Sequence, residues 1–223
     1  MKLIIDSANV DKIKEYLEYL PIDGVTTNPS ILKAEGKIEF INHMKEIRHI
    51  IGIDKSLHVQ TISDTAEGMV RDAHDILESI DDQVYVKIPT SKEGLKAIKQ
   101  LKAESVNITA TAIYSTMQGL LATEMGADYL APYINRMQNL DTDPFLVVNQ
   151  LARNIEQTNS STRILGASYK NVSQVIDSLM AGATHVTVGS DVLDKFLDNA
   201  NIAKAVADFG QDWNTIHERF SIK

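Results

Sequence analysis

Short runs of apolar and β-branched residues alternate along the whole chain with longer stretches in which apolar residues recur at helical spacing. The short runs predict strands, and the longer stretches predict amphipathic helices between them. Strands are expected at 3–6, 24–27, 57–62, 84–88, 106–111, 128–133, 163–168 and 184–188. Helices are expected near 9–20, 38–51, 65–80, 91–104, 115–125, 143–158, 171–181, 190–197 and 201–218.

Capping residues support several of these helix boundaries. Ser91 and Asn171 stand immediately before helical stretches, where a side-chain oxygen can accept a hydrogen bond from a free backbone N–H. Pro144 stands at a first helical position, which its fixed backbone angle suits. Glycines follow three of the expected helices, where a left-handed cap is favoured: Gly52, Gly126 and Gly182.

The regular alternation of strands and helices indicates an α/β fold with a parallel sheet, because parallel neighbours need a crossover connection. In a chain of 223 residues, eight such units predict a single (β/α)8 TIM barrel over residues 1–200. Residues 201–223 are expected to form an extra C-terminal helix. A doubly wound open sheet is the alternative, but the glycine-rich nucleotide loops typical of that fold are absent from the sequence.

Composition narrows the classes of function. The formal net charge of −8 argues against a nucleic-acid partner, which would need a basic face, but leaves anionic small molecules as substrates. The chain has no cysteine, so it has neither disulfides nor thiol nucleophiles. No apolar run approaches the length of a membrane span, and the first residues do not resemble a signal peptide. A cytoplasmic protein without membrane contact is expected.

The strand at 84–88 carries a lysine among β-branched residues. Alternation places Val86 and Ile88 on one face of the strand, and Tyr85 and Lys87 on the other. A lysine here can extend its amine to water along an apolar stem, which is the common arrangement. Alternatively, an apolar wall lowers the pKa of the amine and makes it a nucleophile.

The other strands favour the second interpretation of Lys87, because polar side chains gather near their C-terminal ends. Catalytic groups of (β/α)8 barrels occupy that end. Each side chain alone has a structural explanation, such as a helix cap or a satisfied core group. Together they predict a site formed with Lys87 by Asp6, Thr26, Asn28, Gln60, Thr111, Tyr133, Arg136 and Ser168. The histidines show no pattern of ligand spacing, so no metal is expected.

Four segments carry a resemblance to a known family. They are GVTTNPS at 24–30, TAEG at 65–68, VKIP at 86–89 and APYINR at 131–136. With their spacing, they resemble the transaldolase family over essentially the whole chain. The short length is similar to that of the subfamily that includes fructose-6-phosphate aldolase. The chain departs from the family pattern after 136, where MQNLDTDPFLVV replaces a usually glycine-rich loop beside the acceptor pocket.

The resemblance implies a class I aldolase that needs no metal or organic cofactor. It implies that Lys87 forms a Schiff base with a sugar ketone and that Asp6 assists the proton transfers. Gln60, Thr111 and Tyr133 would then surround a catalytic water. A neutral Gln60 beside a phenol is the pattern of fructose-6-phosphate aldolase, whereas transaldolases of similar length typically have glutamate and phenylalanine at these positions.

The resemblance also implies the ligands of the site. Thr26 and Asn28 would hydrogen-bond the donor end, while Arg136 and Ser168 would grip a phosphate, whose geometry suits a guanidinium. The substrates would be a sugar phosphate and dihydroxyacetone. The C-terminal helix could pack beneath its own barrel, but the resemblance favours packing on a neighbouring subunit of a homo-oligomer, a decamer in this family.

Three functions follow as hypotheses. The first is an aldolase that cleaves fructose 6-phosphate to free dihydroxyacetone and glyceraldehyde 3-phosphate, or forms it from them. The second is a transaldolase that passes the dihydroxyacetone unit between sugar phosphates. The third is a non-catalytic barrel that binds a sugar phosphate. Gln60 and Tyr133 favour the first hypothesis over the second, and Lys87 argues against the third.

Overall fold

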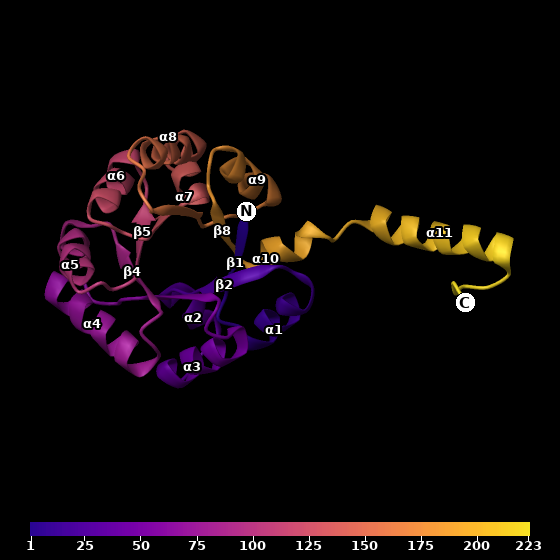
Figure 1. Cartoon of the computed structure of the whole chain (residues 1–223), viewed down its shortest axis with the longest axis horizontal. Helices are drawn as coiled ribbons and strands as arrows, with labels where there is room; N and C mark the ends of the chain where they lie inside the picture. Colours follow the sequence, from indigo (N-terminus) through magenta and orange to yellow (C-terminus); the bar gives the residue numbers. More distant parts are fainter.

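The barrel predicted from the sequence is the fold of the computed structural model, which describes residues 1–223. Eight parallel strands close in the order β1 to β8, so the open-sheet alternative is wrong. Figure 1 shows the ring of helices around the strands. The strands are β1 Lys2–Asp6, β2 Ile22–Thr26, β3 Ser56–Gln60, β4 Tyr85–Pro89, β5 Ile108–Ile113, β6 Tyr129–Pro132, β7 Arg163–Gly166 and β8 His185–Val188.

All nine helical stretches expected from the sequence form helices, with ends within a few residues of the predicted ones. They are α1 Val10–Tyr19, α3 Phe40–Ile51, α4 Ala66–Ser79, α5 Lys92–Ala103, α6 Thr116–Glu124, α8 Pro144–Gln157, α9 Val172–Met180, α10 Ser190–Leu193 with the 3-10 turn η1 Asp194–Phe196, and α11 Ala200–His217. Two short helices, α2 Pro29–Ala34 and α7 Ile134–Gln138, were not predicted. With six and five residues, they are too short to show a helical period.

A glycine in α5 lets that helix pack closely against the end of β4, the strand that carries Lys87. The side chain of Ser91 caps α5 by accepting from the backbone N–H of Gly94. A Cβ atom at Gly94 would lie only 1.8 Å from the carbonyl oxygen of Pro89, the last residue of β4. Any other residue there would therefore push α5 away from β4, so this glycine fixes how the helix supports the strand that carries Lys87.

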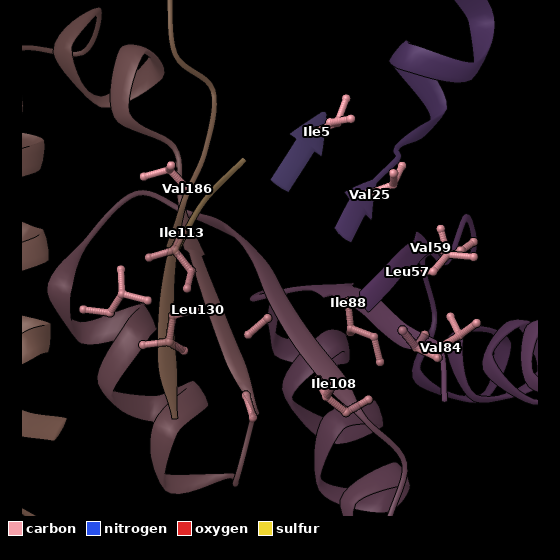
Figure 2. Packing of buried hydrophobic residues seen from close by; sticks show 14 of the residues in the cluster. Ile5, Val25, Leu57, Val59, Val84, Ile88, Ile108, Ile113, Leu130 and Val186 are labelled. Carbon is pink, nitrogen blue, oxygen red and sulfur yellow. The ribbon is translucent and has the colours of Figure 1, made fainter. Parts of the chain in front are cut away.

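Strand residues alternate between two separate cores. The helix-facing side chains belong to a cluster of 42 buried residues between the sheet and the surrounding helices. Figure 2 shows part of this cluster, including Ile5, Val25, Ile88, Ile108 and Leu130. A second, smaller cluster fills the inside of the barrel, where Ile4, Tyr129 and Leu165 pack together with Tyr85. The alternation predicted for β4 is thus confirmed.

The interior of the barrel changes character along its axis. The two rings of the smaller cluster, Tyr85 and Tyr129, are the first residues of β4 and β6 and therefore lie where the strands begin. Toward the strand ends the interior is polar and buried: Thr26, Thr109 and Thr111 are fully buried and Thr187 is 3% exposed. Lys87 projects into this polar half. The fold therefore places the chemistry at the C-terminal end of the strands, as is usual for such barrels.

The C-terminal helix α11 stands apart from the barrel. Figure 1 shows it extending outward beyond α10, and none of its residues is buried. Large apolar side chains are exposed along it, among them Ile202, Val206, Phe209 and Ile216. Packing beneath its own barrel, the simpler expectation for this helix, is therefore wrong. No helix of the chain has the length and hydropathy needed to cross a membrane.

A histidine lies in the middle of the barrel interior. His58 of β3 is fully buried, and its ring stacks on that of Tyr85 with the centroids 4.9 Å apart. Its Nδ1 lies 2.8 Å from the hydroxyl of Thr109, whereas Nε2 has no hydrogen-bond partner. Burial, and after it the charge of Lys87, holds the pKa of His58 well below its usual value of 6.5.

His58 should therefore limit stability in acid. Because the pKa is lower in the folded state, unfolded chains take up a proton below pH 6.5 that the folded barrel excludes. Compared with His58→Phe, which retains a stacked ring, the wild type should lose about 1.4 kcal/mol of unfolding free energy per pH unit below that point. Urea unfolding between pH 8 and pH 5 measures this difference. Parallel stability curves for the two proteins would contradict it.

Candidate active site

The predicted site residues meet in one cavity at the C-terminal mouth of the barrel. Its volume is about 590 Å³. The predicted residues that line it are Asp6, Thr26, Asn28, Lys87, Thr111, Tyr133, Arg136 and Ser168. They come from the ends of β1, β2, β4 and β5 and from the segments that follow β2, β6 and β7. Strand closure thus brings together residues that are far apart in the sequence.

The amine of Lys87 is buried inside the barrel. The residue is 5% exposed, and its Nζ donates a 2.6 Å hydrogen bond to the backbone carbonyl of Thr27. Burial lowers the pKa of Lys87 from its usual 10.5, and the nearby carboxylate of Asp6 opposes that shift. No carboxylate lies within ion-pair distance of Nζ. The nucleophile interpretation of the lysine therefore fits this environment better than an amine that reaches water.

Asp6 is held by a chain of hydroxyls across the strand ends. The hydroxyl of Thr26 donates to its carboxylate at 2.6 Å and lies 2.5 Å from the hydroxyl of Thr187. Since Thr26 gives its proton to Asp6, Thr187 is the donor in the second bond. Burial raises the pKa of Asp6, while Lys87 and the Thr26 hydrogen bond oppose the rise. The raised pKa suits the carboxyl group of Asp6 to proton transfer, because its protonated form is favoured more than in an ordinary aspartate.

On the opposite side of the barrel from Asp6, a phenol meets a guanidinium. The hydroxyls of Tyr133 and Thr111 are 3.0 Å apart, and burial raises the pKa of Tyr133. The guanidinium of Arg136 lies over the ring of Tyr133, 4.7 Å from its centroid, and donates to the hydroxyl of Tyr114 at 3.2 Å. Arg136 keeps further N–H groups free for an anion, because a guanidinium carries five donors.

Gln60 is the predicted site residue that does not line the cavity. Its Cα pairs with that of Lys87 across β3 and β4, so the two side chains leave the sheet at the same level. The Oε1 atom of Gln60 is buried and has no hydrogen-bond partner in the protein. Such an atom is costly unless it is satisfied by a ligand or a water. Gln60 thus lies beside Lys87 on the neighbouring strand but outside the cavity wall.

Two of the predicted residues, Asn28 and Ser168, also have structural roles, which were the alternative explanation for them. The side chain of Asn28 caps α2 by accepting from the backbone N–H groups of Ser30 and Ile31, so only its amide nitrogen remains free for a ligand. Ser168 adopts a left-handed backbone with φ of 61°. A non-glycine residue in that region is strained, and such strain gathers at functional sites.

Several cavity residues were not predicted. They are Ser7, Ser30, Glu35, Asn135, Asn139, Lys170, Thr187 and Asp191, with apolar neighbours. Thr187 could have been found, because it alternates with Val186 and Val188 on β8 and so faces inward. Glu35 follows the six-residue helix α2, and Asp191 lies in the four-residue helix α10; elements this short have too few residues for a period to show which side chains face the cavity. No three histidine or carboxylate side chains come together as metal ligands.

Comparison with known proteins agrees with the geometry of the site. The family model described as "Transaldolase/Fructose-6-phosphate aldolase" matches residues 3–222. A "Probable fructose-6-phosphate aldolase" of Streptococcus pneumoniae is 50% identical to the chain over 222 residues, which is 100% of both proteins. This similarity spans the barrel and α11 alike.

Replacing the buried amine should stabilise the barrel. The pKa of Lys87 is lower in the folded state than its usual 10.5, so the charged form of the buried amine reduces the unfolding free energy. This reduction is largest at low pH and disappears as the pH rises through 10.5. Lys87→Met should therefore raise the unfolding free energy at pH 7 by about 1–4 kcal/mol, with a smaller gain at pH 10.

The matched control for this measurement is Lys14→Met, which replaces an exposed lysine of α1. Denaturant unfolding at both pH values gives the comparison. A gain for Lys87→Met no larger than that of the control, or one that grows with pH, would show that the amine is not destabilised by burial.

Proposed function

The chain belongs to the transaldolase/fructose-6-phosphate aldolase family, and we propose that it cleaves fructose 6-phosphate to dihydroxyacetone and glyceraldehyde 3-phosphate. The same enzyme would form the sugar phosphate in the reverse direction. One observation carries the proposal: Lys87, an amine 5% exposed with a lowered pKa, opens into a cavity lined by Asp6, Tyr133 and Arg136.

The reaction begins with the neutral amine of Lys87. It attacks C2 of the ketone, and loss of water from the carbinolamine gives an imine. When the C4 hydroxyl gives up its proton, the C3–C4 bond breaks, and its electron pair moves to the imine nitrogen as an enamine. The aldehyde leaves. Protonation of the enamine at C3 and addition of water then release dihydroxyacetone and restore the amine.

Asp6 and Tyr133 carry the protons in this scheme. The raised pKa of Asp6 lets the carboxyl group hold a proton that an ordinary aspartate would have lost. The phenol of Tyr133, 3.0 Å from the hydroxyl of Thr111, can position a water beside the imine. The unpaired Oε1 of Gln60 provides a further acceptor for that water. Thr26 and the free amide nitrogen of Asn28 bind the hydroxyls of the donor.

Arg136 holds the phosphate of the sugar. Its guanidinium lies at the rim of the cavity over the ring of Tyr133 and forms no ion pair within the chain. A phosphate matches the paired N–H donors of a guanidinium. Ser168 lines the same rim and supplies a hydroxyl. The phosphate end is thereby kept away from Asp6, where a second negative charge would be repelled.

Transaldolase activity uses the same imine but passes the three-carbon unit to a second sugar phosphate before water releases it. The neutral side chain of Gln60 favours release, because the water beside the imine then depends on the phenol of Tyr133. A barrel that only binds a sugar phosphate would have no need of a buried amine, and Lys87 argues against that function.

We further propose that α11 completes a homo-oligomer, with a decamer as the expected size. The helix is fully outside its own barrel and exposes Val206 at 65% and Phe209 at 71%. Exposed apolar side chains in a row on a helix are typical of a surface covered by a partner. The cytoplasm is the compartment we propose, since a chain without cysteine needs no oxidising environment.

Trapping the imine tests the central step. After incubation with dihydroxyacetone and reduction with borohydride, peptide mass spectrometry should find the reduced adduct on Lys87, because only this lysine is buried and its burial lowers the pKa. Lys87→Met should give no adduct and lose activity by at least about 10³-fold. Modification of other lysines with Lys87 unmodified would rule out the mechanism.

The choice between release and transfer depends on Gln60. The wild type should release free dihydroxyacetone from fructose 6-phosphate faster than it transfers the unit to erythrose 4-phosphate. Gln60→Glu should shift the ratio toward transfer, and Tyr133→Phe should reduce release by about 10- to 100-fold, as expected for loss of a proton-transfer group. Product assays with and without the acceptor give both rates. Unchanged release in Tyr133→Phe would refute the role of the phenol.

The role of α11 can be tested in the full chain. Placing a charge in its apolar row with Phe209→Glu should reduce the mass of the assembly, because the buried charge would have no partner. Gln211→Glu, which adds the same charge on the side of the helix opposite to the apolar row, serves as the control. Light scattering after size exclusion gives the masses. A wild type that runs as a monomer, or a Phe209→Glu variant of unchanged mass, would contradict the assembly.

A further inference from the structure

A second cavity, of about 500 Å³, lies at the N-terminal mouth of the barrel. This is the end where the strands begin, opposite to Lys87. The cavity is lined by the starts of several strands and by the segment before β3, including Lys55, Tyr85, Tyr129, Arg163 and His185. None of these residues takes part in the chemistry proposed for the other end.

The floor of this cavity is a cluster of rings around Tyr129, which is 4% exposed. The ring of Tyr85 meets it edge-on at 5.0 Å and that of His185 at 5.1 Å. Burial and the neighbouring Arg163 lower the pKa of His185 to about 4, so its ring is neutral at pH 7. These rings form a rigid base that presents hydroxyl and imidazole groups to the mouth.

Two cations of the cavity form no ion pair. The guanidinium of Arg163 lies 5.2 Å from the centroid of Tyr129 and donates to its hydroxyl at 2.8 Å, yet it forms no ion pair, and neither does the ammonium of Lys55. By contrast, Lys2 at the same mouth is paired with Asp23 at 2.7 Å. A rigid guanidinium and a free ammonium beside a concave surface form an anion site with fixed geometry.

We propose that the N-terminal mouth is a second ligand site, which binds a phosphate group, free or carried by a small polyol, between Arg163 and Lys55. The guanidinium offers paired donors to the phosphate oxygens, and Lys55 adds a point charge. The hydroxyl of Ser56, which also lines the cavity, donates to the backbone carbonyl of Asp23 at 3.4 Å and can accept a hydrogen bond from a polyol hydroxyl. The carboxylate of Asp54 at the rim would accept hydroxyl protons of a polyol and would repel a second anionic group.

The experiment must separate this site from the one at the other end. Arg136→Ala removes the guanidinium at the C-terminal mouth and is the background for all variants. Inorganic phosphate and glycerol 3-phosphate are titrated into the protein at low ionic strength, and binding is followed by calorimetry. We expect one saturable site in the background protein. Tighter binding of glycerol 3-phosphate would identify a phosphorylated polyol as the ligand, and equal affinities would identify free phosphate.

The cations are then neutralised one at a time in the same background. Arg163→Gln and Lys55→Gln should each weaken binding at least tenfold, whereas Lys14→Gln, on the exposed side of α1, should leave it unchanged. Lys55→Gln alone is sufficient if loss of the Tyr129 contact unfolds the Arg163 variant. Absence of saturable binding, or binding that neither neutralisation weakens, would overturn the proposal.

Discussion

Burial of one amine is the constraint on which the rest of the molecule depends. Lys87 is 5% exposed inside a closed barrel and contacts a backbone carbonyl rather than a carboxylate. Desolvation makes the charged form of such an amine costly and so favours the neutral, nucleophilic form. Asp6 opposes this shift without reaching ion-pair distance.

The layers of the barrel interior sustain that arrangement. The rings around Tyr129 and Tyr85 close the N-terminal half, with His58 above them bonded to Thr109. Thr109 pairs directly with Lys87 across β4 and β5, so water is excluded from beneath the amine. On the C-terminal side, the amine faces the cavity that holds Asp6 and the phenol of the proposed proton relay. This cavity shares no lining residue with the one at the N-terminal mouth, so the rings and His58 separate the amine from that mouth.

Strand alternation made most of the residues inside the barrel predictable from the sequence. A period of two residues assigns each strand residue to the helix side or the barrel side, and Lys87 and Thr111 followed directly from it. The short helices α2 and α7 escaped prediction because they have six and five residues, and the orientation of Asp191 because the helix that carries it, α10, has only four. Gln60 pairs with Lys87 across β3 and β4 but does not line the cavity, since alternation fixes the face of a side chain and not its reach.

The protonation of Lys87 can be measured directly. Lysine labelled with ¹³C and ¹⁵N at the end of the side chain gives a signal for each amine, and the signal absent from Lys87→Met belongs to this residue. A desolvated amine should titrate with a midpoint below 10.5, the usual pKa of lysine. A midpoint for Lys87 at or above 10.5 would contradict the origin of its nucleophilicity in burial.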